Sequence, residues 1–261
     1  MKKGFLCYSK EEEERMGGRV FLFSGFVMVM FCTICMGGSF SDDFSDGDME
    51  GWVVVDDPDN LMSDAAPSSW EVKGGPINGQ AVYQGSNRWG DPTDQISLGT
   101  YLIYDQAEWN DFIFEFDTVA NDNDGLGFVW RWQDRLNHYR CMMVIDPGSR
   151  GPFRRIEKRL GEDGDDFPYY DFLATSLESY TQGVPMHMKV EVVGTKMTVF
   201  IDDEEVLTAD DDTYDVGKIG FALYAEQAYF DNVEVTEIAR AVEPGGKSAA
   251  SWGHIKSGYV R

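Results

Sequence analysis

The sequence predicts an all-β fold in which two antiparallel sheets pack face to face as a sandwich. From Phe40 onward there is almost no helical periodicity, apolar and polar residues alternate in short runs, and Gly, Asp, Asn and Pro separate these runs. Alternation with a period of two is typical of strands that bury one face, and short runs bounded by turn residues are typical of sandwiches.

The run "DFIFEFDTV" (residues 111–119) predicts the first long strand. Its three phenylalanines fall on one face, and Glu115 and Asp117 fall on the other. Because successive side chains of a strand point to opposite faces, we expect the phenylalanines to be buried and the two carboxylates to point outward.

The run "GLGFVWRW" (residues 125–132) predicts a second strand, joined to the first by an acidic loop. Its large apolar residues occupy every second position, and Arg131 lies on the opposite face. A sandwich needs large apolar side chains between its sheets. We therefore expect most of this stripe to be core rather than a sugar-stacking surface, with Trp132 near the rim. The stripe comprises Leu126, Phe128, Trp130 and Trp132.

The remaining runs predict further strands of the same kind. Residues 137–145 alternate, and residues 186–210 read as a meander with turns at Gly194-Thr195 and Asp202-Asp203. The segment "RRIEKRLGEDGDD" predicts a strand followed by an acidic loop, and two last runs, 217–225 and 228–235, close the predicted domain.

We expect the two ends of the chain to lie outside the folded domain. In residues 1–39, arginines precede an apolar stretch and then small residues, which is the order of a secretory signal peptide. An uncleaved membrane anchor is the alternative, although the apolar stretch is shorter than the roughly 20 residues of a spanning helix. We expect a domain over 40–236, a linker or sorting tail over 237–261, and a secreted, extracellular or cell-surface location.

The charge of the chain limits the classes of partner it can bind, and its cysteine content limits how the domain can be cross-linked. The formal net charge is −24, which disfavours binding to nucleic acid or to anionic membranes and attracts cations. A membrane partner is expected only if residues 1–39 remain attached. Cys141 is the single cysteine of the predicted domain, so no internal disulfide is available to it. A hard cation such as calcium is a natural substitute in a carboxylate-rich domain.

The runs "DNDGLGFVWRWQDRLNHYRCMM", "VEVVGTKMTVFIDDEEVLTADDDTYDVGKIGFALYAEQAYFDNVEV" and "DDFSDGDMEGWVVV" resemble the concanavalin A-like lectin and glucanase jelly-roll superfamily. The resemblance spans roughly Ser41 to Thr236 and is nearest to laminin-G-like and thrombospondin C-terminal-type domains. It implies a two-sheet antiparallel jelly-roll sandwich, extracellular and often calcium-binding, that binds glycans or matrix partners. It does not imply catalysis, because this superfamily hosts enzymes and lectins alike.

Two groups of residues are candidates for a structural calcium ion. The first and last strands of a jelly roll commonly lie side by side, which would bring Asp42 or Asp43 close to Asp231 and Asn232. The alternative is that these residues only form a turn and a solvated strand end.

The second group is the acidic loop, with Asp122 and Asp124. It is not an EF-hand: placing Gly125 at the sixth position puts Ala120 first and Arg131 twelfth, where carboxylates are required. Asn, Asp and Gly also favour turn angles without any ion, so an ordinary turn is the alternative.

A candidate ligand-binding face follows from the alternation, on the assumption that neighbouring strands of one sheet present their polar sides together. Fixed carboxylates, guanidinium groups and an aromatic ring suit hydroxyl-rich or anionic sugars. The alternative is a ladder of cross-strand ion pairs with a small net energy. The predicted ligand residues are Glu115, Asp117, Arg131, His138, Arg140 and Tyr224.

These observations favour a secreted, non-catalytic, calcium-binding module whose ligand is a polysaccharide or glycoprotein. One alternative is a carbohydrate-active enzyme. A laminarinase-type Glu-x-Asp-x-x-Glu motif is only half present at Glu115 and Asp117, and a lyase reading would use His138, Arg140 and Tyr224. A structural adhesion protein displayed through its C-terminal tail is the other alternative. The sequence does not specify an oligomeric state.

Overall fold

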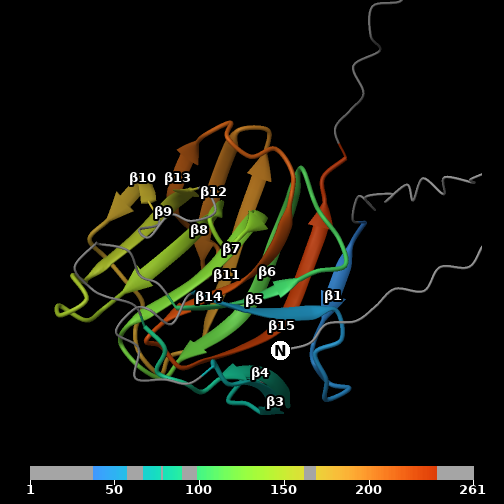
Figure 1. Cartoon of the computed structure of the whole chain (residues 1–261), viewed down its shortest axis with the longest axis vertical. Coiled ribbons are helices and arrows are strands. Elements are labelled where there is room, and N and C mark those ends of the chain that lie inside the picture. The colour runs from blue at the N-terminus through green and yellow to red at the C-terminus, as the bar shows by residue number, and fades with distance from the viewer. Residues whose placement is uncertain (1–37, 58–66, 78, 90–98, 162–168, 240–261) are drawn as a thin grey trace, which may run out of the picture. The chain divides into compact units, whose positions relative to one another are not determined.

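The structure is a computed structural model that describes residues 38–57, 67–77, 79–89, 99–161 and 169–239. Within these ranges the chain forms two antiparallel sheets and no helix (Figure 1). The described residues therefore include no helix long and apolar enough to cross a membrane. The predicted signal or anchor at 1–39 lies almost wholly outside the described residues. The acidic loop 162–166 lies outside them, as does nearly all of the predicted tail.

One sheet has seven strands. Its members in spatial order are β10 (Tyr169–Ser176), β9 (Phe153–Leu160), β8 (Asn137–Val144), β7 (Gly125–Asp134), β14 (Lys218–Tyr224), β5 (Thr100–Tyr104) and β2 (Trp52–Asp56).

The other sheet has eight strands. Its members in spatial order are β13 (Glu204–Asp210), β12 (Lys196–Ile201), β11 (Met186–Val193), β6 (Phe112–Ala120), β15 (Ala228–Glu237), β4 (Gln80–Gln84) and β3 (Trp70–Gly74), and β1 (Phe40–Asp42) pairs with β15 outside this path. The predicted all-β sandwich is therefore confirmed, and so is the meander β11–β12–β13 with turns at Gly194 and at Asp202-Asp203.

The core fills the space between the two sheets. The phenylalanines of β6 alternate with half-buried side chains, as predicted, and they pack on Phe128 of β7 and Phe221 of β14. Trp130 is fully buried, and its indole Nε1 lies 3.2 Å from Met197 Sδ of the opposite sheet. Large rings thus reach across from both sheets, which explains the dense aromatic stripe in the sequence.

The seven-stranded sheet also buries its outer face. On β5, β7, β8, β9 and β14 the residues that alternate with the inter-sheet core form a second apolar cluster: Tyr101, Ile103, Val129, Trp132, Met142, Val144, Phe153 and Ala222. A sheet with two buried faces reads as nearly continuous apolar sequence. This explains why β7 and β8 have few exposed positions. The outer face of this sheet is buried, whereas strands β6 and β11 of the other sheet have half-buried or exposed side chains on their outer face.

Strands β6 and β7, which are consecutive in the chain, do not pair with each other. β6 pairs with β11 and β15, whereas β7 pairs with β8 and β14. The acidic segment 121–124 therefore crosses from one sheet to the other. The expectation that β6 and β7 contribute to one polar face is wrong, because the two strands belong to opposite layers.

Candidate functional site

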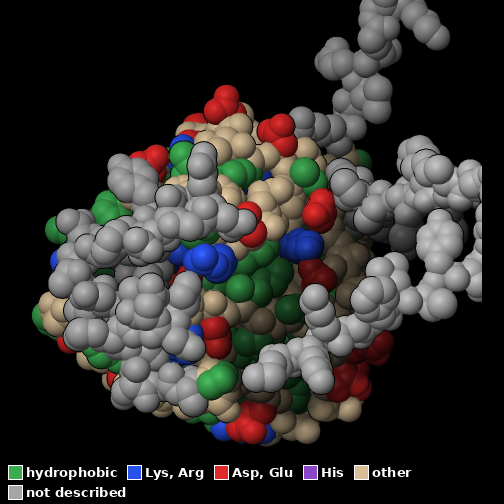
Figure 2. All heavy atoms as spheres, viewed as in Figure 1, with side chains coloured by type: hydrophobic (Ala, Val, Ile, Leu, Met, Phe, Trp, Pro, Cys, Tyr) green, Lys and Arg blue, Asp and Glu red, His purple; other side chains and the backbone are tan. Residues whose placement is uncertain are grey.

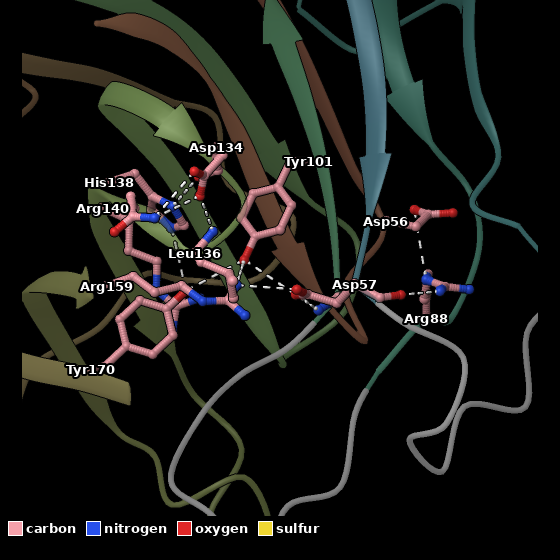
Figure 3. A network of polar contacts seen from close by, with 12 residues as sticks. Asp56, Asp57, Arg88, Tyr101, Asp134, Leu136, His138, Arg140, Arg159 and Tyr170 are labelled. Carbon is pink, nitrogen blue, oxygen red and sulfur yellow. Dashed lines mark hydrogen bonds and ion pairs between the residues drawn. The ribbon is translucent and has the colours of Figure 1, made fainter. Parts of the chain in front are cut away.

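A network of buried charged and aromatic side chains lies on the outer face of the seven-stranded sheet, beside the second apolar cluster (Figure 3). Strand alternation places its members there: on β8 and β9 the polar residues occupy the positions between core residues such as Cys141 and Ile156. The network residues are Asp57, Tyr101, His138, Arg140, Glu157, Arg159 and Tyr170.

One half of the network joins Arg159, Tyr101 and Asp57. Arg159 Nη1 donates to the Tyr101 hydroxyl at 2.8 Å and to Asp57 Oδ1 at 3.1 Å, and the same hydroxyl donates to Asp57 Oδ2 at 3.2 Å. Burial, and next the Asp57 carboxylate, raise the pKa of Tyr101 well above its ordinary value, so the phenol stays protonated. The guanidinium is therefore held in place by one carboxylate and one neutral phenol.

Asp57 follows directly after β2 and is itself held by the Gly99 amide and the Arg88 side chain. Its Oδ2 accepts a hydrogen bond from the Gly99 amide at 3.0 Å, and its carbonyl oxygen accepts one from the Arg88 guanidinium. Arg88 Nε also lies 3.6 Å from Asp56 Oδ1. As Figure 3 shows, these contacts continue the network from the sheet into the adjoining loops.

The other half of the network joins Arg140 and Glu157 across β8 and β9. Arg140 Nε donates to Glu157 Oε2 at 2.6 Å, and both side chains are 1% exposed. The Arg140 guanidinium also lies 3.7 Å from the ring centre of Tyr170, a cation–π contact. Burying an ion pair this deeply costs several kcal/mol of desolvation per ion, so this pair is a weak source of stability.

His138 connects the two halves. Its Nδ1 lies 3.1 Å from the Asp134 carbonyl oxygen, which can only accept, so Nδ1 carries the ring proton and Nε2 carries the lone pair. Nε2 faces the Tyr170 hydroxyl at 3.4 Å, and the ring stacks on Trp132 at 4.5 Å. Burial, and next Arg159 and Arg140, lower the pKa of His138 well below its usual range. The imidazole is therefore neutral at pH 7.

Some hydrogen-bond donors of the network are not used within it. Among the described residues, Nε and Nη2 of the fully buried Arg159 have no hydrogen-bond partner. Buried polar groups are normally paired, and an unpaired donor costs about 1–3 kcal/mol or more when it is charged. These two nitrogens are therefore fixed, unused donors on a buried part of the face.

The predicted ligand residues are divided among separate places. His138 and Arg140 lie together in the network, as expected. Glu115 and Asp117 lie on the outer face of the other sheet, where Asp117 Oδ1 is 2.8 Å from His187 Nδ1 and Asp117 Oδ2 accepts from Asn232 Nδ2 at 2.7 Å. The single predicted patch is wrong, because β6 and β8 belong to different sheets.

Arg131 is also not on that patch. It has a positive φ of 46° at a bulge, where the pairing of β7 and β8 shifts between Trp130 and Asp134. Its guanidinium is 1% exposed and donates to the carbonyl oxygens of Tyr214, Asn110 and Gly194 at 2.7–2.9 Å. Arg131 thus ties three loops together at one end of the sandwich.

The same bulge reverses the facing of Trp132. It is buried, but it packs in the second apolar cluster on the outer face instead of following Trp130 into the inter-sheet core. The extra residue at the bulge shifts the alternation by one position. As a result, Trp132 provides the ring on which His138 stacks.

Tyr224 and the acidic segment lie near a buried carboxylate, Glu226. Glu226 accepts hydrogen bonds from the Asp122 amide at 2.7 Å and from the Tyr180 hydroxyl at 2.8 Å. Tyr224 packs over Gly125, away from the network. Asp124 Oδ1 accepts from Ser149 Oγ at 2.7 Å, and burial, opposed by that hydrogen bond, raises the pKa of Asp124. These contacts make the segment a fixed inter-sheet connection.

The chain-end candidates for calcium are brought near one another only at the backbone. β1 pairs with β15, so the first and last strands lie side by side as expected (Figure 1). Asp43 is exposed and accepts from the Ser45 amide, whereas the buried Asp231 accepts from the Asn232 amide. Within the described ranges no three His, Cys, Asp or Glu side chains form a metal-binding group. These residues do not converge as ligands, and calcium at either place stays a prediction.

Sequence reasoning missed most of the network. Arg155, Glu157 and Arg159 alternate along "RRIEKRL", so their common face was readable from the period of two. Asp57, Tyr101 and Tyr170 gave no comparable signal, because Asp57 lies in a loop and both tyrosines sit in ordinary strand patterns. Contacts between residues separated by 102 positions, such as Arg159 and Asp57, are not visible in local periodicity.

The fold is a two-sheet antiparallel sandwich of the jelly-roll type. Residues 39–236 match the family described as 3-keto-alpha-glucoside-1,2-lyase-like domain, and the chain belongs to this family. No protein with a curated description matches the chain in sequence.

Solved structures show the same fold. The chain is similar to the carbohydrate-binding module CBM66 from Bacillus subtilis (TM-score 0.52, 20% identity, 72% of this chain and 96% of that chain). It is also similar to a galectin-like protein of unknown function from Bacillus subtilis (TM-score 0.54, 12% identity, 79% and 99%). A third similar structure is a GH16 protein of Bacteroides ovatus in complex with a G4G4G3G product (TM-score 0.51, 14% identity, 75% and 99%). At these identities the likenesses show the shared fold, and together with the family match they are consistent with the predicted concanavalin A-like resemblance.

Proposed function

We propose that this chain is a non-catalytic carbohydrate-binding domain whose ligand lies on the outer face of the seven-stranded sheet. The observation that carries the proposal is Arg159: its guanidinium is fully buried beside Tyr101 and Tyr170, and it keeps two nitrogens without a hydrogen-bond partner among the described residues. Membership of a family described by glycoside chemistry supports a sugar as the ligand.

The chemistry of the face suits saccharides. Sugar hydroxyls accept hydrogen bonds from guanidinium groups and donate to carboxylates, and sugar rings pack on aromatic side chains, so a site needs fixed polar groups beside apolar surface. Here Arg159 and Asp57 supply the fixed polar groups, and Trp132 and Tyr170 supply the rings. Because the groups are held by one another, little conformational entropy is lost on binding.

Binding of glycans by the full chain tests the proposal. We expect one or more classes on a glycan array to bind, with the affinity measured by titration calorimetry. Arg159→Gln should weaken that binding by about tenfold or more, since it removes charged hydrogen bonds. Lys196→Gln removes one positive charge from an exposed position on the other sheet and should leave the affinity unchanged. Unchanged affinity in a folded Arg159→Gln variant, or no glycan bound at all, contradicts the proposal.

A structural calcium ion and an extracellular or cell-surface location belong to the same proposal. Support comes from the formal net charge of −24, from the single cysteine of the domain and from the superfamily resemblance. The polysaccharide or glycoprotein ligand would then be met outside the cell.

His138 favours a second candidate function, a lyase acting on a 3-keto glucoside. The family description names a 1,2-lyase, and such a reaction removes the proton from C2, next to the ketone, and breaks the bond between C1 and the leaving oxygen. A neutral imidazole with its lone pair on Nε2 can accept the C2 proton. The electron pair passes through an enolate, whose oxygen Arg159 can stabilise, and then expels the aglycone oxygen, which takes up a proton.

Turnover separates the two candidates. If the chain is a lyase, incubation with a 3-keto disaccharide yields an unsaturated keto sugar and the free aglycone, detected by mass spectrometry. His138→Gln should then abolish product formation while the affinity for the substrate is retained. Binding without product in the unsubstituted chain identifies the non-catalytic domain instead.

A further inference from the structure

Arg155 is a charged side chain of this face that reaches solvent. It lies on β9, two positions from Glu157 on the same side of the strand, and its side chain is 18% exposed. Its guanidinium carbon lies 3.8 Å from the ring centre of Phe153 and 4.2 Å from that of Phe172. Phe153 is buried, whereas Phe172 is 40% exposed. The two rings therefore fix the guanidinium while its edge and one aromatic surface remain accessible.

The charge of Arg155 is poorly compensated. Among the described residues, its closest carboxylate oxygen belongs to Glu157 at 3.9 Å, and Glu157 is already engaged by Arg140 at 2.6 Å. Two guanidinium groups thus share one carboxylate, and Arg155 Nε has no hydrogen-bond partner among the described residues. Burial, opposed by Glu157, and repulsion from Arg140 and Arg150 lower the pKa of Arg155. An anion placed beside Arg155 would relieve this repulsion.

The excess of positive charge is local. On this face the described side chains include three guanidinium groups, Arg140, Arg155 and Arg159, and two carboxylates, Asp57 and Glu157. The chain as a whole carries a formal net charge of −24, and in Figure 2 acidic side chains are spread over the visible face. A cationic site in so acidic a protein selects for anionic ligands by charge.

We propose that Arg155 binds an anionic substituent of the saccharide, a carboxylate or a sulfate, while the sugar ring stacks on Phe172. This inference rests on the proposed carbohydrate-binding function and names its ligand class, an acidic saccharide. Arginine suits the role because its planar fork donates two parallel hydrogen bonds to a carboxylate or sulfate, which a lysine cannot do.

The more deeply buried side chains, Arg159 and Tyr101, would then bind the uncharged hydroxyl groups of the ligand. Arg159 and Tyr101 are 0% and 1% exposed, and their donors and acceptors suit hydroxyl groups. Arg155 lies nearer to solvent, where a charged substituent can stay partly hydrated and avoid the full cost of desolvation. Because different side chains bind the charged substituent and the neutral sugar, substituting Arg155 should affect binding of the charge without affecting binding of the sugar ring.

The test uses pairs of saccharides that differ only in charge. Uronate oligosaccharides are compared with their methyl esters, and sulfated oligosaccharides with their desulfated forms, by calorimetry with the full chain. We expect an acidic member to bind about tenfold or more tightly than its neutral partner. Arg155→Gln should remove that preference and leave the affinity for the neutral partner unchanged, and Arg155→Lys should restore it only in part. Lys196→Gln serves as the charge-matched control and should keep the preference.

The outcomes distinguish failure of the anionic site from failure of the proposed carbohydrate-binding function. If neutral partners bind as tightly as acidic ones, or if Arg155→Gln keeps the preference, the anionic site is wrong and the carbohydrate-binding function stands. If neither member of any pair binds, the carbohydrate-binding function fails. Preference for uronates alone or sulfates alone identifies which acidic group Arg155 receives.

Discussion

Arg140 and Glu157 face each other across β8 and β9, with Nε and Oε2 2.6 Å apart and both side chains 1% exposed. The pair lies on the outer face of the seven-stranded sheet, on the second and third strands from the β10 edge. Arg155 lies 3.9 Å from the same carboxylate, and Tyr170 covers the Arg140 guanidinium. One buried carboxylate thus lies within 4 Å of two guanidinium groups.

Removing that carboxylate should therefore be strongly destabilising. We expect Glu157→Ala to lower the free energy of unfolding by about 3–5 kcal/mol, because it removes the carboxylate that pairs with the buried Arg140 guanidinium. Urea denaturation measures the change. Glu191→Gln, at an exposed position of β11, should stay within about 0.5 kcal/mol of the unsubstituted chain. A loss below about 1 kcal/mol for Glu157→Ala would show that the pair is not effectively buried.

Glu226 predicts a pH dependence of stability. Burial, opposed by hydrogen bonds from Asp122 and Tyr180, raises the pKa of Glu226 to about 7 from 4.5. Between these two values the folded state holds more protons than the unfolded state, so stability falls as pH rises through this window. The shift is equivalent to about 3 kcal/mol between pH 4 and pH 8.

Glu226→Gln tests this dependence. The amide cannot titrate, so the decline in unfolding free energy between pH 4.5 and 7 should be absent from the variant. Glu234→Gln, at an exposed position of β15, should keep it. Parallel pH profiles for Glu226→Gln and the unsubstituted chain would rule out the raised pKa as their cause.

The proposed calcium ion predicts a shift in melting temperature. An ion that binds only the folded state, at 100 times its dissociation constant, adds about 2.7 kcal/mol. For a domain of about 200 residues this raises Tm by several degrees, at roughly 2–4 °C per kcal/mol. Thermal unfolding of the full chain in chelator and in millimolar calcium measures it. Asp231→Asn should abolish the shift and Asp203→Asn should keep it, and equal melting in both buffers rejects a structural ion.

Arg131 predicts a stability effect without a binding effect. Arg131→Met removes the donors to the carbonyl oxygens of Tyr214, Asn110 and Gly194, and we expect a loss of about 3 kcal/mol or more. Glycan affinity of the folded variant should not change, because Arg131 lies apart from the network. Weaker binding at a temperature where the variant is fully folded would place Arg131 in the ligand site after all.

The fold was predicted well from the sequence because the local alternation of apolar and polar residues is enough to identify the strands and their buried faces. The phenylalanines of β6 and the pair Phe128 and Trp130 are buried between the sheets as expected, and the turns of the β11–β13 meander fall where Gly194 and the Asp202-Asp203 pair indicate. These features depend on neighbouring residues only. A period of two is enough to assign the faces of a strand without knowing its partners.

The candidate site was predicted only in part because it depends on which strands pair. Glu115 and Arg140 both point outward, yet from opposite sheets, since the segment after β6 crosses the sandwich. The bulge at Arg131 was also hidden, because a positive φ at a residue other than Gly, Asn or Asp has no sequence signature. The partners of Arg159 come from segments far apart in the chain.

The pairing of β1 with β15 has a mechanical consequence. Phe40 faces Val235 and Asp42 faces Val233 in an antiparallel register, so the chain enters and leaves the domain at the same end of this short pair. A pulling force applied to the two flanking segments would open the pair one hydrogen bond at a time, as a zipper opens, rather than shear it as a unit. β1 would therefore detach at low load while the remaining strands stay folded, which makes its release a natural first response of this domain to tension.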